Sequence, residues 1–147
     1  MIEKGFAYLL LHDAAVRDLA RGRVYPVKVP EAGGLPAVTY SRSGTDRASY
    51  FLGAANPVKA VLDVTCWADS YAAAKDLAGR VSAAAPPGGN DRNLGDGYRG
   101  WWGPARDVFV QKTDVNADAD SYAPPVDDSA VGVHSVALTV TIWYDET

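Results

Sequence analysis

The sequence predicts an α+β fold, in which a mainly antiparallel β-sheet has two α-helices packed on one face and carries long loop or hairpin arms. Residues 58–85 show a strand pattern that runs directly into a helix pattern. Several other segments alternate between apolar and polar residues, which is typical of half-buried strands. Only that one helix pattern lies between strands that could pair in parallel, so the remaining strands can be joined as hairpins and meanders.

The central strand is predicted over residues 58–68. Its even positions, from Val58 to Ala68, are all apolar, and its odd positions are mostly polar. This period of two, with many β-branched residues, predicts a strand whose even face is buried. Val61 and Trp67 are apolar exceptions on the odd face, so we expect that face to be partly covered as well.

A helix is predicted to follow this strand at once. Asp69 or Ser70 offers a side-chain oxygen to the N–H groups of the first helical turn. Apolar residues then recur at spacings of three and four, which makes one stripe along a helix. The stripe consists of Tyr71, Ala74, Leu77, Ala78, Val81 and Ala85. The sequence PPGG at residues 86–89 ends the helix.

The N-terminal part predicts a helix over residues 2–11 and a short helical turn over residues 14–20. The apolar face of the helix consists of Ile2, Phe6, Leu9 and Leu10. Asp13 can cap the short turn, which presents Val16 and Leu19 and ends at Gly22.

Four further strands are predicted, over residues 24–27, 37–43, 106–113 and 131–144. Pro26 has no N–H group, which confines the first of them to a sheet edge. The last is the longest, and its apolar positions change from odd to even near His134, which predicts a bulge there.

Three polar or glycine-rich stretches are predicted to be arms outside the sheet. Residues 44–57 are expected to form a hairpin arm, residues 86–104 a glycine-rich loop, and residues 114–128 an acidic arm. Loops of this length are usually functional or disordered. The arms hold the residues that we predict to contact other subunits or partners, namely Tyr50, Phe51, Trp101, Trp102, Asp114, Asp118 and Asp120.

The composition fits a single globular domain over residues 1–147, since 48% of the residues are hydrophobic and 22% are charged. A net charge of −4 argues against a simple phosphate-binding surface. Cys66 is the single cysteine, so no disulfide can form within the chain and a reducing compartment is favoured. The N-terminus does not resemble a signal peptide, and no stretch approaches the ~20 apolar residues of a membrane span.

Residues able to carry chemistry are few and scattered, so the sequence predicts no enzyme. His12 and His134 are far apart in the chain, and Cys66 faces the apolar side of a strand, where thiols are inert. A nucleophile pair of Cys66 with a histidine is the alternative. One cysteine and two distant histidines do not make a zinc site. We predict no cofactor and no metal.

The acidic arm begins like a calcium-binding loop, with aspartate or asparagine at every second position from residue 114 to residue 120. Ala119 stands where such a loop needs glycine for its turn, and Pro125 stands where it needs a bidentate glutamate. We therefore predict a solvated acidic arm.

Four segments resemble one protein family when they are taken in order. They are AAVRDLARGRVYP at residues 14–26, LPAVTY at residues 35–40, VTCWADSYAAAKDLA at residues 64–78 and LTVTIWY at residues 138–144. With this order and spacing, the chain resembles the tail-completion proteins, or tail terminators, of long-tailed bacteriophages, prophages and gene transfer agents. It departs from the family at residues 86–104 and 114–128, which are longer and richer in glycine or aspartate.

The resemblance implies a structural virion protein without catalytic activity. Such subunits form a ring, commonly a hexamer, that caps the head-proximal end of the tail tube and joins the tail to the head. The implied partners are sister copies, the tail tube protein and head–tail connector proteins, and DNA passes the ring without specific binding. The implied location is the virion tail, after assembly in the host bacterial cytoplasm.

Other functions stay open from the sequence. The nearest alternative is another head–tail connector or a tail-tube subunit, because tube proteins share a related α+β architecture. A small enzyme or a nucleic-acid-binding module is the alternative from a different class. A cluster of catalytic or basic residues would favour it, and the sequence contains none.

Overall fold

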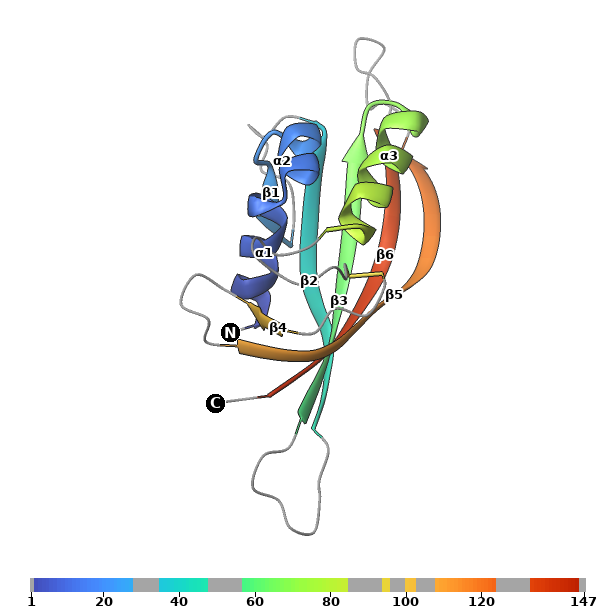
Figure 1. Cartoon of the computed structure of the whole chain (residues 1–147). Helices are drawn as coiled ribbons and strands as arrows, with labels where there is room; N and C mark the ends of the chain where they lie inside the picture. Colours follow the sequence, from blue (N-terminus) through green and yellow to red (C-terminus); the bar gives the residue numbers. More distant parts are fainter. Residues whose placement is uncertain are drawn as a thin grey trace, which may run out of the picture.

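A computed structural model describes residues 2–27, 35–47, 57–84, 94–95, 100–102, 108–123 and 133–145. It confirms the α+β fold, with helices on a six-stranded and mainly antiparallel sheet (Figure 1). The helices are α1 (Ile2–His12), α2 (Ala14–Ala20) and α3 (Tyr71–Ser82). The strands are β1 (Val24–Pro26), β2 (Ala37–Arg47), β3 (Pro57–Ala68), β4 (Gly100–Trp102), β5 (Val108–Ala123) and β6 (Val133–Asp145). None of these described helices has the length and apolar character needed to cross a membrane.

The sheet has the strand order β1-β2-β3-β6-β5-β4, with β3 and β6 at its centre. These two strands are antiparallel and pair without a register shift from Pro57 opposite Asp145 to Ala68 opposite His134. Among the described strands, β1 and β2 form the only parallel pair. The expected edge position of Pro26 is confirmed, because β1 is the outermost strand on its side.

The alternation predicted for the central strand is confirmed. In β3 the buried residues are Val58, Ala60, Leu62, Val64, Cys66 and Ala68. The odd face of β3 is partly covered, as expected: Val61 and Trp67 are half-buried. On that face the Trp67 indole Nε1 donates a hydrogen bond to the Thr39 hydroxyl over 2.9 Å, and Thr39 is buried.

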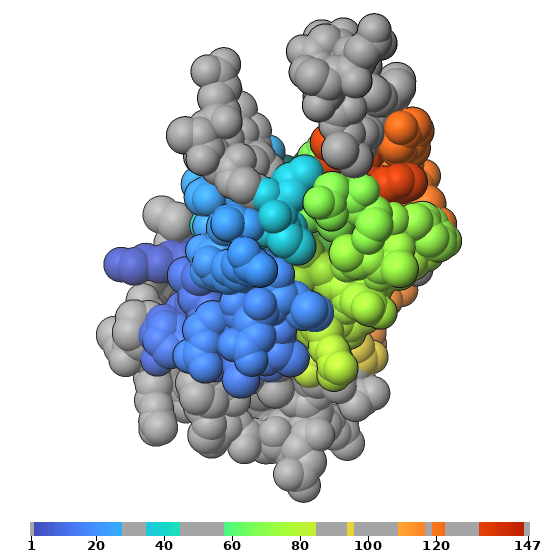
Figure 2. All heavy atoms as spheres, turned by 90° about the horizontal axis from the view of Figure 1, so that it is seen from above, coloured from blue at the N-terminus to red at the C-terminus, as the bar shows by residue number. Residues whose placement is uncertain are grey.

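The helices lie together on one face of the sheet. Figure 2 shows α1 and α2 beside α3, with β5 and β6 behind α3 (Figure 2). The buried residues that α1 and α3 contribute to the core are Ile2, Phe6, Leu9, Leu10, Ala74, Leu77, Ala78 and Val81. Two residues predicted to be on the apolar stripes are instead exposed: Tyr71 by 51% and Leu19 by 37%. Tyr71 is the first residue of α3, and its side chain lies over the sheet margin instead of under the helix.

The helix ends are fixed by the capping residues that the sequence offers. The Ser70 hydroxyl accepts a hydrogen bond from the Ala73 N–H over 3.2 Å, and the Asp13 carboxylate accepts from two N–H groups of α2. α2 ends where Arg21 and Gly22 adopt positive φ angles of 54° and 74°. This left-handed turn reverses the chain into β1.

Replacing the α3 cap should destabilise the protein moderately. We expect Ser70→Ala to lower the free energy of unfolding by about 1 kcal/mol, because the first turn of α3 loses its side-chain acceptor. Urea unfolding measures the change. Ser82→Ala at the opposite end of α3 is the matched control and should change stability by less than about 0.5 kcal/mol. An equal effect of the two variants would contradict the capping role.

The predicted acidic arm is wrong over most of its length. Residues 114–123 belong to β5, which pairs with β6 from Phe109 opposite Asp145 to Ala123 opposite Val133. The strand pattern is hidden in the sequence because the register shifts twice, at residues 110–112 and at residues 116–118. Each shift moves the inward-facing positions from even to odd or back, so no single alternation runs through the segment.

The bulge expected near His134 is also wrong. β6 pairs with β3 in continuous register through this region, and its even positions from Val136 to Tyr144 are buried. The register shifts occur instead in β5 and in β2, between Arg42 and Gly44. Ser135 and Thr141 are buried residues of the opposite parity, and they face the side of the sheet opposite the described helices.

β2 and β3 form the predicted antiparallel pair that leads into the 44–57 arm. β2 is longer than expected and ends at Arg47, and β3 already begins at Pro57. Arg47 pairs with Val58 at the outer end of this ladder. Residues 48–56, which contain the predicted contact residues Tyr50 and Phe51, lie outside the described residues.

Candidate functional site

The shifts in β5 place the predicted acidic contact residues at different sites. Asp114 pairs with Thr141, Asp118 with Leu138 and Asp120 with Val136. Paired residues of neighbouring strands project to the same face of a sheet. Val136 is in the core beneath the helices, so Asp120 lies on the helix face; Asp114 lies on the opposite face. The sequence interpretation treated these aspartates as one acidic set, and the structure separates them.

Asp120 connects β5 to the first turns of α3. One carboxylate oxygen accepts a hydrogen bond from the Tyr71 hydroxyl over 2.9 Å. The other lies 2.8 Å from the Lys75 ammonium group. The ammonium group also lies 5.7 Å from the centre of the Tyr71 ring. Tyr71, Lys75 and Asp120 therefore form one polar cluster at the margin of the sheet.

His134 and Tyr122 extend this cluster along the sheet margin. The His134 ring lies 4.7 Å from the Tyr122 ring and 6.2 Å from the Tyr71 ring, measured between centroids. Tyr122 is 54% exposed. We call Tyr71, Lys75, Asp120, Tyr122 and His134 the margin cluster. Two exposed tyrosines held by fixed partners are typical of protein–protein contact surfaces, where tyrosine is enriched.

The charges within the margin cluster support each other. The hydrogen bonds from Lys75 and from Tyr71 hold the pKa of Asp120 below its ordinary value. The hydrogen bond between Tyr71 and Asp120 also raises the pKa of Tyr71, because the Tyr71 hydroxyl donates its proton to a carboxylate. Both shifts favour the state in which Asp120 is ionised and Tyr71 is protonated, which is the state that holds α3 to β5.

The lowered pKa of Asp120 predicts a change of stability with pH. A carboxyl group whose pKa is lower in the folded state stabilises that state above its unfolded pKa of about 4, and this contribution is lost as the pH falls through the folded value. We therefore expect Asp120→Asn to make stability less dependent on pH below about pH 4. Urea unfolding between about pH 2.5 and pH 7 measures this.

The control for this pH experiment removes the partner instead of the carboxylate. Lys75→Met removes the cation that contributes most to the lowered pKa of Asp120. Below about pH 4, the dependence of stability on pH should therefore become weaker, but less so than in Asp120→Asn. Curves for Asp120→Asn and the unsubstituted protein that run parallel below pH 4 would show that Asp120 makes no such contribution.

Asp114 lies on the opposite face of the sheet, beside a different set of charges. Its carboxylate is 3.6 Å from the Lys112 ammonium group, and both side chains are well exposed. The Lys112 and Lys59 ammonium groups lie 5.1 Å and 5.8 Å from the ring centre of Trp143. Asp114 is therefore part of a mixed, solvent-facing surface and does not join the margin cluster.

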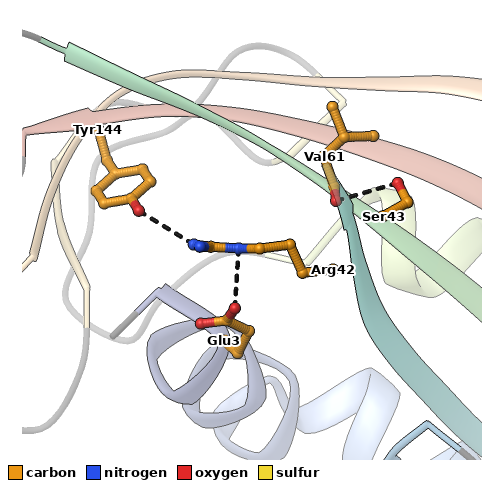
Figure 3. Close-up of polar contacts among 5 residues, drawn as sticks. All are labelled: Glu3, Arg42, Ser43, Val61 and Tyr144. Carbon is orange, nitrogen blue, oxygen red and sulfur yellow. Dashed lines mark hydrogen bonds and ion pairs between the residues drawn. The ribbon is translucent and has the colours of Figure 1, made fainter. Parts of the chain in front are cut away.

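A third group of polar contacts links α1 to β2, near the edge of the sheet that lies opposite β5 (Figure 3). Arg42 of β2 forms an ion pair with Glu3 of α1 over 2.9 Å and donates a hydrogen bond to the Tyr144 hydroxyl of β6 over 3.1 Å. Next to it, the Ser43 hydroxyl donates to the Val61 carbonyl across the β2 bulge. Arg42 therefore joins three separate elements.

A hollow of about 490 Å³ lies beside this link, between α1, the end of β1 and β2. Its lining is Glu3, Lys4, Ala7, Pro26, Val27, Tyr40, Ser41 and Arg42. Burial, and then the negative charge of Glu3, raise the pKa of Tyr40. Glu3 and Arg42 at the hollow are already engaged with one another, which is the pattern of a structural ion pair and not of a poised acid or base.

The tryptophans predicted in the 86–104 loop are in a strand. Trp101 and Trp102 belong to β4, where they pair with Phe109 and Val108. The rest of that segment is described only at Leu94 and Gly95. Leu94 is buried, and its carbonyl accepts a hydrogen bond from the Thr113 hydroxyl over 2.9 Å. Leu94 therefore packs on the core next to β5.

The three residues considered for chemistry lie in different surroundings. Cys66 is buried in the core. The His12 ring stacks on Tyr8 at 3.9 Å, and the His134 ring is part of the margin cluster. Within the described ranges, no group of three or more His, Cys, Asp or Glu residues could hold a metal ion.

The sequence alone points to Asp120 as a contact residue but does not reveal Tyr71 and Lys75, the side chains that fix its position. Tyr71 was assigned to the buried stripe because it stands three residues before Ala74. Its polar end and its place at the first helical position were the signals that could have placed it at the surface. Lys75, Tyr122 and Arg42 carried no local signal, because their partners lie far away in the chain.

Comparison with known proteins connects this fold to phage tails. The sequence profile of the family described as tail completion protein gp17 matches residues 7–86, a range that begins within α1 and extends past the end of α3. No protein with a curated description matches the sequence. Among solved structures, the chain is similar to a chain in "Virion of native gene transfer agent (GTA) particle". The TM-score is 0.59 at 16% identity, over 96% of this chain and 92% of that chain.

The structural similarity shows a shared fold across almost the whole chain. The family match is independent of it and covers more than half of the sequence, including the motifs at residues 14–26, 35–40 and 64–78. The resemblance found from those motifs is thereby confirmed: the chain belongs to the tail completion protein gp17 family.

Proposed function

We propose that this protein is a tail terminator. Its copies form a ring, with six subunits, on the head-proximal end of the tail tube, where the ring stops tube polymerisation and offers the surface to which the head is joined. The observation that carries the proposal is the family match over residues 7–86. Tail completion is a structural role, so no catalysed reaction is part of the proposal.

The fold similarity supports the same role. The similar chain comes from a gene transfer agent virion, and the similarity extends over 96% of the present chain. This favours residues 1–147 acting as one tail-terminator-like domain. In the proposal the partners are sister copies, the tail tube protein and the head–tail connector proteins. The protein assembles in the host bacterial cytoplasm and resides in the virion tail.

The charge of the chain fits a channel for DNA. A ring around the DNA path must let the phosphate backbone slide, and proteins bind phosphates mainly through clustered Lys and Arg. The chain carries 14 basic and 18 acidic residues, so it offers no basic excess to hold the DNA. The contact residues proposed for the ring and its partners remain Tyr50, Phe51, Trp101, Trp102, Asp114, Asp118 and Asp120.

The proposal is tested by electron microscopy of particles made without this protein. We expect overlong tails without heads, because tube polymerisation has lost its stop. Expression of the intact protein from a second gene copy should restore tails of normal length and their attachment to heads. A complete absence of tails would point to a tail-tube subunit. Tails of normal length that lack heads would point to another connector, and either result would overturn the terminator role.

A further inference from the structure

The outer edge of β5 is long and lies at the margin of the sheet. β4 pairs only with residues 108–110 of β5, and β6 occupies the other side of the strand. Among the described residues, no strand pairs with the outer edge of residues 114–122. In Figure 1 this part of β5 forms the right-hand margin of the ribbon (Figure 1). An edge of this kind is a template for a strand from another chain.

The same part of β5 carries the margin cluster. Tyr71 and Tyr122 are both more than half exposed, and Asp120 and His134 hold them in place. In Figure 2 the corresponding parts of α3, β5 and β6 meet at one side of the molecule (Figure 2). Main-chain edge groups and preorganised tyrosines at one margin are two independent features of a contact surface.

The opposite side of the sheet offers a second strand edge. β3 occupies one edge of residues 41–47 of β2. β1 pairs with the other edge only at residues 38–40, so among the described residues no strand pairs with the outer edge of residues 41–47. The two edges differ in charge. Residues 114–122 contain three aspartates and no basic residue, whereas residues 41–47 contain two arginines and one aspartate. The chain thus carries two strand edges of unlike charge, and Arg42, Asp114 and Asp120 on them also contact an oppositely charged side chain of the same chain.

We infer that residues 114–122 of one copy, together with the margin cluster, receive residues 41–47 of the β2 edge of the next copy. Because the two edges are different surfaces of the same chain, the contact is heterologous, and its repetition closes into a ring when the rotation between subunits allows it. The register shift at residues 116–118 and the aspartates hinder indiscriminate pairing of this edge. This inference rests on the proposed ring and identifies the strands that form it.

Cysteine cross-linking in assembled particles tests the contact. Ser43 and Ser121 are exposed and lie on strands separated by three strand spacings, or about 14 Å, which is too far for a disulfide within one chain. Cys66 is fully buried and does not interfere. Ser43→Cys is combined with Ser121→Cys in one variant and with Asn116→Cys in another, so that either end of the β5 edge is sampled.

Particles containing each double variant are treated with a mild oxidant, copper phenanthroline, which forms disulfides only between adjacent thiols, and are separated under denaturing, non-reducing conditions. We expect a ladder of covalent multimers up to the ring size from at least one double variant, because each copy is linked to two neighbours. The single variants are the controls and should give no species beyond dimers. If the assembled rings of both double variants yield no covalent species larger than a dimer, the inference is overturned.

A second measurement uses the unsubstituted protein. Amide hydrogen exchange of residues 114–122 and 41–47 should be at least tenfold slower in assembled particles than in the dissolved chain, while residues of β3 should change little. Equal exchange in both states would overturn the strand contact. Neither measurement depends on tail length. A negative result for the strand contact therefore leaves the terminator role supported if the deletion strain makes overlong tails. Conversely, a confirmed strand contact does not by itself establish that role.

Discussion

Phe6→Ala should lower the free energy of unfolding by about 3–5 kcal/mol. Phe6 is the largest fully buried side chain of α1, and its ring meets the Tyr40 ring edge-on at a centroid distance of 5.9 Å. Truncation leaves a cavity between α1 and β2 and removes this ring contact. A loss of this size is a large part of the 5–15 kcal/mol that stabilises an ordinary domain. Urea unfolding at neutral pH measures it.

Lys4→Ala on the same helix is the matched control for Phe6→Ala. Lys4 is exposed, and alanine is a good helix former, so stability should change by less than about 0.5 kcal/mol. If Phe6→Ala costs less than about 1 kcal/mol, α1 does not pack on the sheet as described.

Leu77→Ala should cost about 2–5 kcal/mol. Leu77 is fully buried in the middle of α3, where the helix packs on β3 and β6. The helix contributes several alanines to this interface, among them Ala74 and Ala78, so Leu77 supplies much of its apolar volume. Loss of the side chain should also loosen the margin cluster, because Tyr71 and Lys75 are carried by the same helix.

Asp76→Ala is the neighbouring control for Leu77→Ala. Asp76 is exposed, so its replacement should change the free energy of unfolding by less than about 0.5 kcal/mol. The amide exchange of β5 residues 118–122 in the free chain should rise in Leu77→Ala and stay the same in Asp76→Ala. Unchanged exchange in Leu77→Ala would show that α3 does not support the β5 margin.

The sequence was sufficient where one periodicity runs through a whole element. The even positions of β3 and the apolar stripe of α1 are buried as predicted. The stripe of α3 is buried from Ala74 to Val81, with Tyr71 as the exception at the helix start, and its last predicted member, Ala85, lies outside the described residues. The α+β class follows from these elements, and the family follows from motifs that lie within them. In such elements the local pattern states directly which side chains face the core.

That the acidic segment is a strand becomes clear only in the folded chain. Residues 114–123 read as a polar arm because two register shifts interrupt their alternation, yet they pair with β6 along their whole length. Strand pairing supplies the backbone hydrogen bonds that make even a polar segment regular, and the pairing partner is not encoded in the segment itself.

The buried faces, the fold class and the family of this protein follow from its amino-acid sequence alone. The contacts that create its candidate surfaces were decided only by the folded chain, since Tyr71 meets Asp120 across 49 residues and Arg42 meets Tyr144 across 102 residues. The physical reason is that burial patterns repeat locally along one element, whereas a hydrogen bond or ion pair between elements depends on their register and on bulges that shift it.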